Sequence, residues 1–275
     1  MVTLRGADRV DRKRAGSPRS WPTPGNRRAA GARDALRELC DALIARRRSG
    51  QTKGEDLLGL LVEARDDGQA LDDREIRDQV LIFILAGHDT TAVALTFALY
   101  LLGRHPAEQG RVREEVDGLL GRGTPGAQDV PALPYTTTVF KEAMRLFPPV
   151  YSFGRRTTGP QRVGPYDIPP GSDVYVSQWV THRHPDFWDA PEHYFPEHFT
   201  PEREAARHRH AYFPFGAGPR ACIGQHFAML EGVIALAVIV RRLELATPSG
   251  SVALAPRITL HPACAVPCRL TPRSA

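Results

Sequence analysis

A segment near the C-terminus combines residue types that can hold a metal ion through sulfur. Residues 213–224 have the sequence FPFGAGPRACIG, and Cys222 lies among its glycines and prolines, just before a long apolar stretch. At the start of a helix, unpaired N–H groups and the helix dipole stabilise an anion, which favours the thiolate, the form of cysteine that ligates metals. A cysteine buried there for packing is the alternative, but it leaves the rest of the segment unexplained.

The residues around Cys222 suit a bulky, planar ligand. Gly218 and Gly224 permit a close approach of the backbone. Phe215 is placed to shield the sulfur from water, and Arg220 is placed to pair with an acidic group on the ligand. The pattern Phe-x-x-Gly-x-Arg-x-Cys-x-Gly as a set therefore favours a ligand site over a packing role.

A second pair of residues stands on a predicted helix that ends at the sequence FPP. Glu142 and Arg145 are three positions apart, so they share one face of that helix and can form an ion pair. This spacing occurs by chance in almost any protein, so the pair gains meaning only from its place in the chain.

Polar residues interrupt the most apolar predicted helix. Residues 86–91, AGHDTT, put a glycine, two threonines and a buried acidic residue at the helix centre, where each is unfavourable. One interpretation is a local kink in which the threonine hydroxyls bond to the helix backbone. The other is an opening of the helix that makes a pocket for O2, with Asp89 and Thr90 supplying a carboxylate and a hydroxyl for proton transfer.

Hydrophobic periodicity predicts the elements that position these residues. An apolar stripe with helical period indicates a helix that begins at about residue 31 and stops near Gly50. The longest predicted helix, about 72–102, begins with Asp72 and Glu75 as a capping box, and its apolar first half, 80–87, is expected to be buried. Further helices are predicted at about 56–64, 107–120, 135–146 and 223–243, short strands at 151–156 and 173–178, and a long loop at 181–214.

In this order along the chain, the motifs resemble those of the cytochromes P450. Residues 213–224 are similar to the haem-binding loop of that family, in which the cysteine is the axial thiolate ligand of the iron. The resemblance places Cys222 in that role. It also implies haem-binding positions for the neighbours named above: Phe215, Gly218, Arg220 and Gly224.

The other two motifs fit the same family. Glu142 and Arg145 resemble the pair on the K helix, which braces the haem-side core and does no chemistry. Asp89 and Thr90 resemble the acid–alcohol pair of the I helix. The resemblance implies a mainly α fold with small β-sheets (α+β), the C-terminal portion of the cytochrome P450 fold.

The family resemblance implies a monooxygenase that inserts one atom of O2 into a hydrophobic small molecule, of fatty-acid or terpenoid type. The implied cofactor is haem b, and the electrons would come from NAD(P)H through a ferredoxin or a flavoprotein reductase. Arg155 matches a position that binds a haem propionate in the family. Arg156 is the alternative, because strand alternation lets only one of the two face the haem.

The first departure from the family is length, because cytochromes P450 are considerably longer and the unmatched part is their N-terminal half. We therefore expect a truncated chain, with residues 1–30 as a flexible or poorly packed tail and 31–275 as the C-terminal part of a haem domain. The strands at 151–156 and 173–178 would then lack sheet partners and leave an open edge. A non-catalytic remnant that binds haem weakly or not at all is the alternative function.

The second departure lies in Pro196-Glu-His-Phe199. The family usually has an arginine in place of His198, and that arginine joins the pair formed here by Glu142 and Arg145. Histidine still donates a hydrogen bond but is a weaker, pH-dependent cation, which predicts a looser brace.

Composition indicates a folded protein of the cytoplasm. The 275 residues are 42% hydrophobic and 24% charged, enough to bury a substantial core. Four scattered cysteines do not suit a disulfide scaffold, and no basic-then-apolar leader opens the chain. The net charge of +5 is modest, so the basic clusters are interpreted as a solvated face or a surface for an acidic protein, with no nucleic acid expected. No membrane span is expected, because His88 and Asp89 fall in the middle of the only candidate.

Three further groups of residues could suggest a metal ion. They are His182-Arg-His184, His208-Arg-His210 and His261-x-x-Cys264-x-x-x-Cys268. The first two lie in a polar loop and are expected to be surface residues. The third has zinc-like spacing but no clear fourth ligand, so it is not expected to hold zinc.

Overall fold

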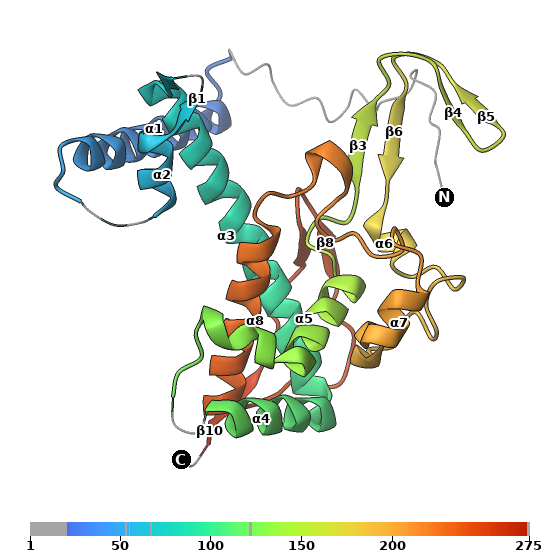
Figure 1. Cartoon of the computed structure of the whole chain (residues 1–275). Coiled ribbons are helices and arrows are strands. Elements are labelled where there is room, and N and C mark those ends of the chain that lie inside the picture. The colour runs from blue at the N-terminus through green and yellow to red at the C-terminus, as the bar shows by residue number, and fades with distance from the viewer. Residues whose placement is uncertain (1–20, 53, 55, 67, 121–122, 274–275) are drawn as a thin grey trace. The chain divides into compact units, whose positions relative to one another are not determined.

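The computed structural model describes residues 21–52, 54, 56–66, 68–120 and 123–273 (Figure 1). The chain divides into two compact units, one of the described residues up to His88 and one from Asp89 onward. The helices and helical turns are α1 (Pro24–Arg48), α2 (Leu57–Glu63), α3 (Asp73–Arg104), α4 (Pro106–Leu120), η2 (Ala127–Ala132), α5 (Pro134–Leu146), α6 (Gln178–Thr181), η3 (Pro196–Phe199), α7 (Pro201–Ala206), η4 (Gly218–Arg220) and α8 (Gln225–Arg242).

The strands are short and pair antiparallel in twos. They are β1 (Arg65–Asp66) with β2 (Gln69–Ala70), β3 (Phe153–Arg156) with β6 (Asp173–Val176), β4 (Gln161–Val163) with β5 (Tyr166–Ile168), β7 (Leu243–Ala246) with β10 (Arg269–Pro272), and β8 (Leu254–Pro256) with β9 (Leu260–Pro262). The predicted class, mainly α with small β-sheets, is confirmed. Since each described sheet has two strands, β3 and β6 both leave an open edge, as expected from the sequence.

The first unit is built from α1, α2 and the first half of α3. Thr23 caps α1 and proline occupies its first turn, so the helix begins at Pro24, earlier than the predicted start at residue 31. The predicted tail therefore includes helical residues, while residues 1–20 lie outside the described part of the chain. A small core of Cys40, Ile44, Ile76 and Val80 joins α1 to α3.

Helix α3 begins as the sequence predicts. The Asp72 backbone N–H donates to the Glu75 carboxylate at 2.9 Å, and the Glu75 N–H donates to Asp72 Oδ1 at 2.7 Å, which is a reciprocal capping box. The predicted burial of residues 80–87 is wrong except at Val80, because Ile82 is 57% exposed and Leu85 is 62% exposed. An all-apolar helix is buried only where the chain supplies a surface against it, and the described residues leave more than half of each of these two side chains uncovered.

The length and composition of α3 would also allow it to cross a membrane. Of its most apolar 18-residue window, 28% is buried. A core helix of a soluble protein passes the same test, so this feature is weak evidence for a span.

The second unit has its core where α3, α4, α5 and α8 pack together (Figure 1). Its fully buried side chains include Phe97 of α3, Val112 of α4, Phe140 of α5 and Leu236 of α8. Apolar burial of this kind is the main stabilising term of a folded domain. The core holds α5 and the start of α8 in place, and these two helices carry the predicted site residues.

Helices α5 and α8 approach closely at Gly232. A Cβ atom at this position would lie 2.2 Å from two carbons of the Phe140 ring. We expect Gly232→Ala to lower the free energy of unfolding by about 1–3 kcal/mol, because the added methyl overpacks the contact. Gly110→Ala in α4, where a Cβ meets nothing within 4 Å, is the matched control and is expected to raise it by about 0.5–1 kcal/mol. Urea denaturation of both variants tests the contact, and an unchanged Gly232→Ala would contradict it.

The predicted loop at 181–214 is packed rather than open. It contains η3 and α7, and Trp188 is fully buried, with the Arg207 guanidinium 3.8 Å from its ring. His208 and His210 are exposed, as expected, but His182 is fully buried and its predicted surface position is wrong. The physical reason is that His182 lies beneath Tyr212 and Phe213, which the loop brings back over it.

Candidate functional site

Cys222 lies in a turn that its own backbone bonds fix. The Cys222 N–H donates to the Phe215 carbonyl at 2.9 Å, which closes a loop over η4. Helix α8 begins at Gln225, with Gly224 as its N-cap, so Cys222 precedes the helix and the predicted start at residue 223 is two residues early. The thiol-bearing residue is exposed. A thiol here is accessible to a ligand while its backbone is held.

Two glycines in this turn have left-handed backbone conformations. Gly216 has φ 71° and Gly218 has φ 73°, values that other residues rarely adopt. A Cβ at Gly218 would meet nothing within 4 Å, so glycine is needed there for the turn, and the space beside it is open. At Gly224 a Cβ would lie 3.8 Å from Cys222 Sγ, an ordinary contact.

Two apolar residues and an arginine close to Cys222 in the chain are exposed. Ile223 is 86% exposed and Phe227 is 71% exposed, and Arg220, two residues before Cys222, is also exposed. Phe215 supplies its carbonyl to Cys222 and packs partly against the hydrophobic core. A sulfur donor, an apolar face and an arginine together fit haem, which has an iron, a flat apolar macrocycle and carboxylate substituents.

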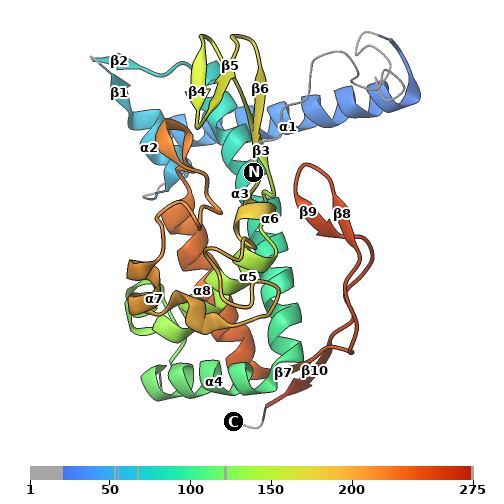
Figure 2. The ribbon, with the colours of Figure 1, turned by 90° about the vertical axis from the view of Figure 1, so that its right-hand side faces the viewer.

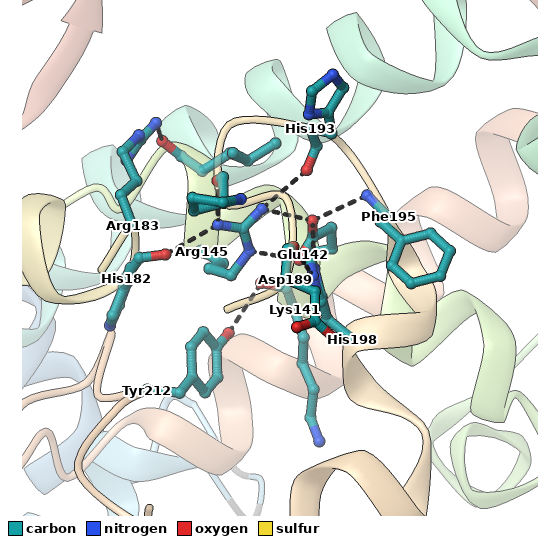
Figure 3. A network of polar contacts seen from close by, with 12 residues as sticks. Lys141, Glu142, Arg145, His182, Arg183, Asp189, His193, Phe195, His198 and Tyr212 are labelled. Atoms are coloured by element: carbon teal, nitrogen blue, oxygen red, sulfur yellow. Dashed lines mark hydrogen bonds and ion pairs between the residues drawn. The ribbon is translucent and has the colours of Figure 1, made fainter. Parts of the chain in front are cut away.

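Glu142 and Arg145 form the predicted ion pair. Arg145 Nε lies 2.7 Å and Nη2 lies 2.8 Å from the two Glu142 oxygens, and neither side chain is exposed (Figure 3). Arg145 also donates to the carbonyls of His182 at 2.8 Å, Pro191 at 2.6 Å and His193 at 2.9 Å. One guanidinium therefore ties α5 to the segment 182–193.

His198 joins this pair, as the sequence comparison with the P450 pattern predicted. Its Nδ1 lies 3.2 Å from Glu142 Oε1 and its Nε2 lies 2.7 Å from the Asp189 carbonyl. Glu142 Oε1 accepts a further bond from the Phe195 N–H at 2.9 Å. The three-residue network of Glu142, Arg145 and His198, called the brace below, is fully buried.

His182 connects the brace to the segment before Cys222, a link that no sequence pattern predicts. Its carbonyl accepts from Arg145, while its Nε2 accepts from the Phe213 N–H at 3.0 Å. Burial, with Arg145 and Arg183 close by, lowers the pKa of His182 to about 3, so the ring is neutral and Nε2 remains an acceptor. A histidine in a polar, proline-rich loop carries no periodic signal that would mark it as buried.

Arg155 and Arg156 point to opposite faces of β3, and their contacts differ. Arg156 pairs with Asp173 of β6 at 3.1 Å. The Arg155 guanidinium lies 4.7 Å from the centre of the Phe153 ring, and Phe153 packs edge-on against Phe213, just before the Cys222 turn. Arg155 therefore shares the face of β3 that is turned toward this turn, which favours it over Arg156.

Asp89 contacts residues far along the chain. Its carboxylate is bonded to the Thr259 hydroxyl and lies 3.2 Å from His261 Nε2, while Thr90 beside it is half-buried. His261 is the histidine of the zinc-like motif named above, and here it contacts Asp89. Within the described part of the chain, no group of three His, Cys, Asp or Glu side chains could hold a metal ion.

Comparison with known proteins identifies the family of the chain. The family model of cytochrome P450 matches residues 15–262. Cyclooctatin synthase of Streptomyces melanosporofaciens is 40% identical over 247 residues, covering 89% of this chain and 54% of that protein. Cyclooctat-9-en-7-ol 5-monooxygenase of the same organism is 39% identical over 233 residues, covering 84% and 50%.

A solved structure of a cytochrome P450 is also similar to this chain. The crystal structure of the cytochrome P450DA heme domain has a TM-score of 0.83 and 34% identity, and covers 88% of this chain and 55% of that chain. The chain thus spans about half the length of the relatives it matches. By sequence, fold and the match to residues 15–262, the chain belongs to the cytochrome P450 family.

Proposed function

We propose that this chain carries the thiolate ligand and the proton-transfer residues of a haem monooxygenase. The reaction inserts one atom of O2 into a hydrophobic small molecule, of fatty-acid or terpenoid type. The observation that supports it best is the exposed Cys222, held by a backbone bond at the start of α8 with exposed apolar side chains beside it. A relative named as a monooxygenase supports the same reaction class.

Cys222 would hold the iron of a b-type haem through its thiolate. The open space at Gly218 suits the close approach of the macrocycle, and Arg220 and Arg155 are the proposed partners of its propionates. When bound, haem supplies the activation of O2, and thiolate ligation favours cleavage of the O–O bond. The role of the chain's own side chains is to hold the group and to deliver protons.

Asp89 and Thr90 are the proposed proton-transfer residues. Asp89 has a side chain that is 45% exposed and already engaged in hydrogen bonds, so its carboxylate can exchange protons with water. Thr90, the next residue of α3, supplies a hydroxyl to continue the transfer.

The proposed electron source is NAD(P)H, through a ferredoxin or a flavoprotein reductase. Arg209, which precedes the Cys222 turn in the chain and is exposed, suits an acidic partner surface. The four cysteines are all free thiols, which supports our proposal of a cytoplasmic protein. The polar His88 and Asp89 within the apolar part of α3 support our proposal that the chain has no membrane span.

The reduced, CO-bound absorption spectrum of the chain expressed with a haem supply tests this function. We expect a red-shifted Soret band in the wild type, its complete loss in Cys222→Ser, and its retention in Cys268→Ser, which changes another exposed cysteine. Loss of the band in both variants would show that serine substitution harms the fold rather than the ligand.

A non-catalytic remnant is the second candidate. The exposed Ile82 and Leu85 favour it, because apolar side chains without cover indicate an incomplete packing surface. Absence of haem from the purified wild type would support this candidate and contradict the monooxygenase.

A further inference from the structure

The β8–β9 hairpin lies beside α3 (Figure 2). Three polar side chains of these two elements contact one another there. Thr259 Oγ1 is bonded to Asp89 Oδ2, His261 Nε2 lies 2.8 Å from Thr259 Oγ1, and the same nitrogen lies 3.2 Å from Asp89 Oδ2. The three atoms form a closed triangle between parts of the chain that are 170 residues apart. All three residues belong to the unit that starts at Asp89.

We propose that Thr259 and His261 are positioning residues that fix the Asp89 carboxylate and pass protons to it. The inference rests on the proposed proton-transfer role of Asp89 and adds the two residues that act through it. Neither residue lies in the motifs from which that role was inferred.

The donors in the triangle can be assigned by counting protons. An ionised carboxylate only accepts, so the single hydroxyl proton of Thr259 must point to Asp89 Oδ2. The Thr259 oxygen then accepts from His261, which requires a proton on Nε2. The hydrogen bonds therefore run in one direction, from His261 through Thr259 to Asp89.

The hairpin that carries Thr259 and His261 is held at independent points. The Leu260 N–H donates to the Pro149 carbonyl at 2.9 Å, and the Tyr151 hydroxyl donates to the Arg257 carbonyl at 2.8 Å. Thr259 is only 6% exposed, so its hydroxyl needs a protein partner. Because the turn is anchored on both sides, the contact to Asp89 is a fixed feature of the hairpin.

This arrangement allows a proton to pass from His261 through Thr259 to Asp89. Starting from the imidazolium form, the Nε2 proton of His261 moves to Thr259 Oγ1 while the hydroxyl proton moves to Asp89 Oδ2. The products are a neutral imidazole, an unchanged hydroxyl and a protonated carboxyl group. The side chain of His261 is 30% exposed, so the imidazole regains its proton from water.

The first test needs no haem and uses NMR of the full chain labelled with ¹⁵N-histidine. We expect the His261 Nε2–H to exchange with water about tenfold more slowly than the ring N–H groups of the exposed His210. Thr259→Val is expected to abolish this protection, whereas Thr259→Ser, which keeps the hydroxyl, restores it. Thr271→Val, an exposed threonine of β10, is the matched control and leaves it unchanged.

The second test follows NADPH consumption by the haem-loaded chain with a plant-type ferredoxin and its reductase. Thr259→Val is expected to slow consumption about tenfold and to raise the solvent deuterium isotope effect, and Thr259→Ser is expected to recover both. A purely structural threonine would not move the isotope effect.

The outcomes separate the two proposals. Rapid exchange of the His261 ring proton, or equal turnover of the valine and serine variants, overturns the inference and leaves the proposed function intact. A protected His261 proton in a wild type that consumes no NADPH contradicts the proposed function, while the positioning of Asp89 stands.

Discussion

Arg145→Ala is expected to lower the free energy of unfolding by about 3–5 kcal/mol, because it leaves Glu142 charged and buried without its partner. Neither side chain of the pair is exposed, so water cannot replace the guanidinium. The carbonyls of His182, Pro191 and His193 lose their donor in the same variant. Urea denaturation followed by circular dichroism measures the change.

Arg156→Ala is the matched control for this prediction. It also breaks an arginine–carboxylate pair, with Asp173, but both side chains are more than half exposed, at 68% and 53%. Exposed pairs contribute about 0–1 kcal/mol, so the two variants should differ severalfold. Equal losses in the two variants would contradict a structural role of the buried brace.

Arg145→Ala is also expected to weaken haem binding at the Cys222 turn. Because Arg145 contacts the His182 carbonyl and the His182 ring accepts from Phe213, loss of the guanidinium should loosen the turn that holds Cys222. We expect Arg145→Ala to bind less haem than Arg156→Ala at the same concentration of folded protein.

Acid is expected to destabilise the chain through His182. The pKa of His182 is about 3 in the folded protein, against an ordinary value of 6.5. Between these two values the unfolded state binds a proton at this residue and the folded state does not, so acid favours unfolding. The stabilisation by the neutral ring is complete above about pH 6.5 and is lost as the pH falls toward 3, at about 1.4 kcal/mol for each pH unit. Between pH 6.5 and 4.5 this amounts to about 2 kcal/mol, because the slope is only half as steep at pH 6.5.

The comparison of His182→Gln with the wild type isolates this contribution. Glutamine offers a carbonyl acceptor to the Phe213 N–H but takes up no proton in this range, so its stability should depend less steeply on pH. His210→Gln, an exposed histidine of the same segment, should keep the wild-type slope. Parallel stability–pH curves for wild type and His182→Gln, from urea denaturation at pH 4.5–7, would argue against a buried neutral His182.

The sequence alone determined those features that depend on neighbours in the chain. The capping box of Asp72 and Glu75 and the pair of Glu142 and Arg145 both use a spacing of three, which any helix brings together. The glycine pattern before Cys222 likewise requires left-handed conformations within one turn. From these local rules the sequence predicted most of the helices, the family, and Cys222 as the ligand residue, without reference to the rest of the fold.

Tertiary structure decided the contacts between distant segments. His182 joins the brace to Phe213, and the β8–β9 hairpin brings Thr259 and His261 to Asp89, although no periodicity links these positions. It also decided that Ile82 is exposed, since burial depends on whether another surface covers a side chain as well as on its hydrophobicity. Local sequence patterns predict a helix or strand and its apolar face, but only tertiary packing determines which distant residues contact that face.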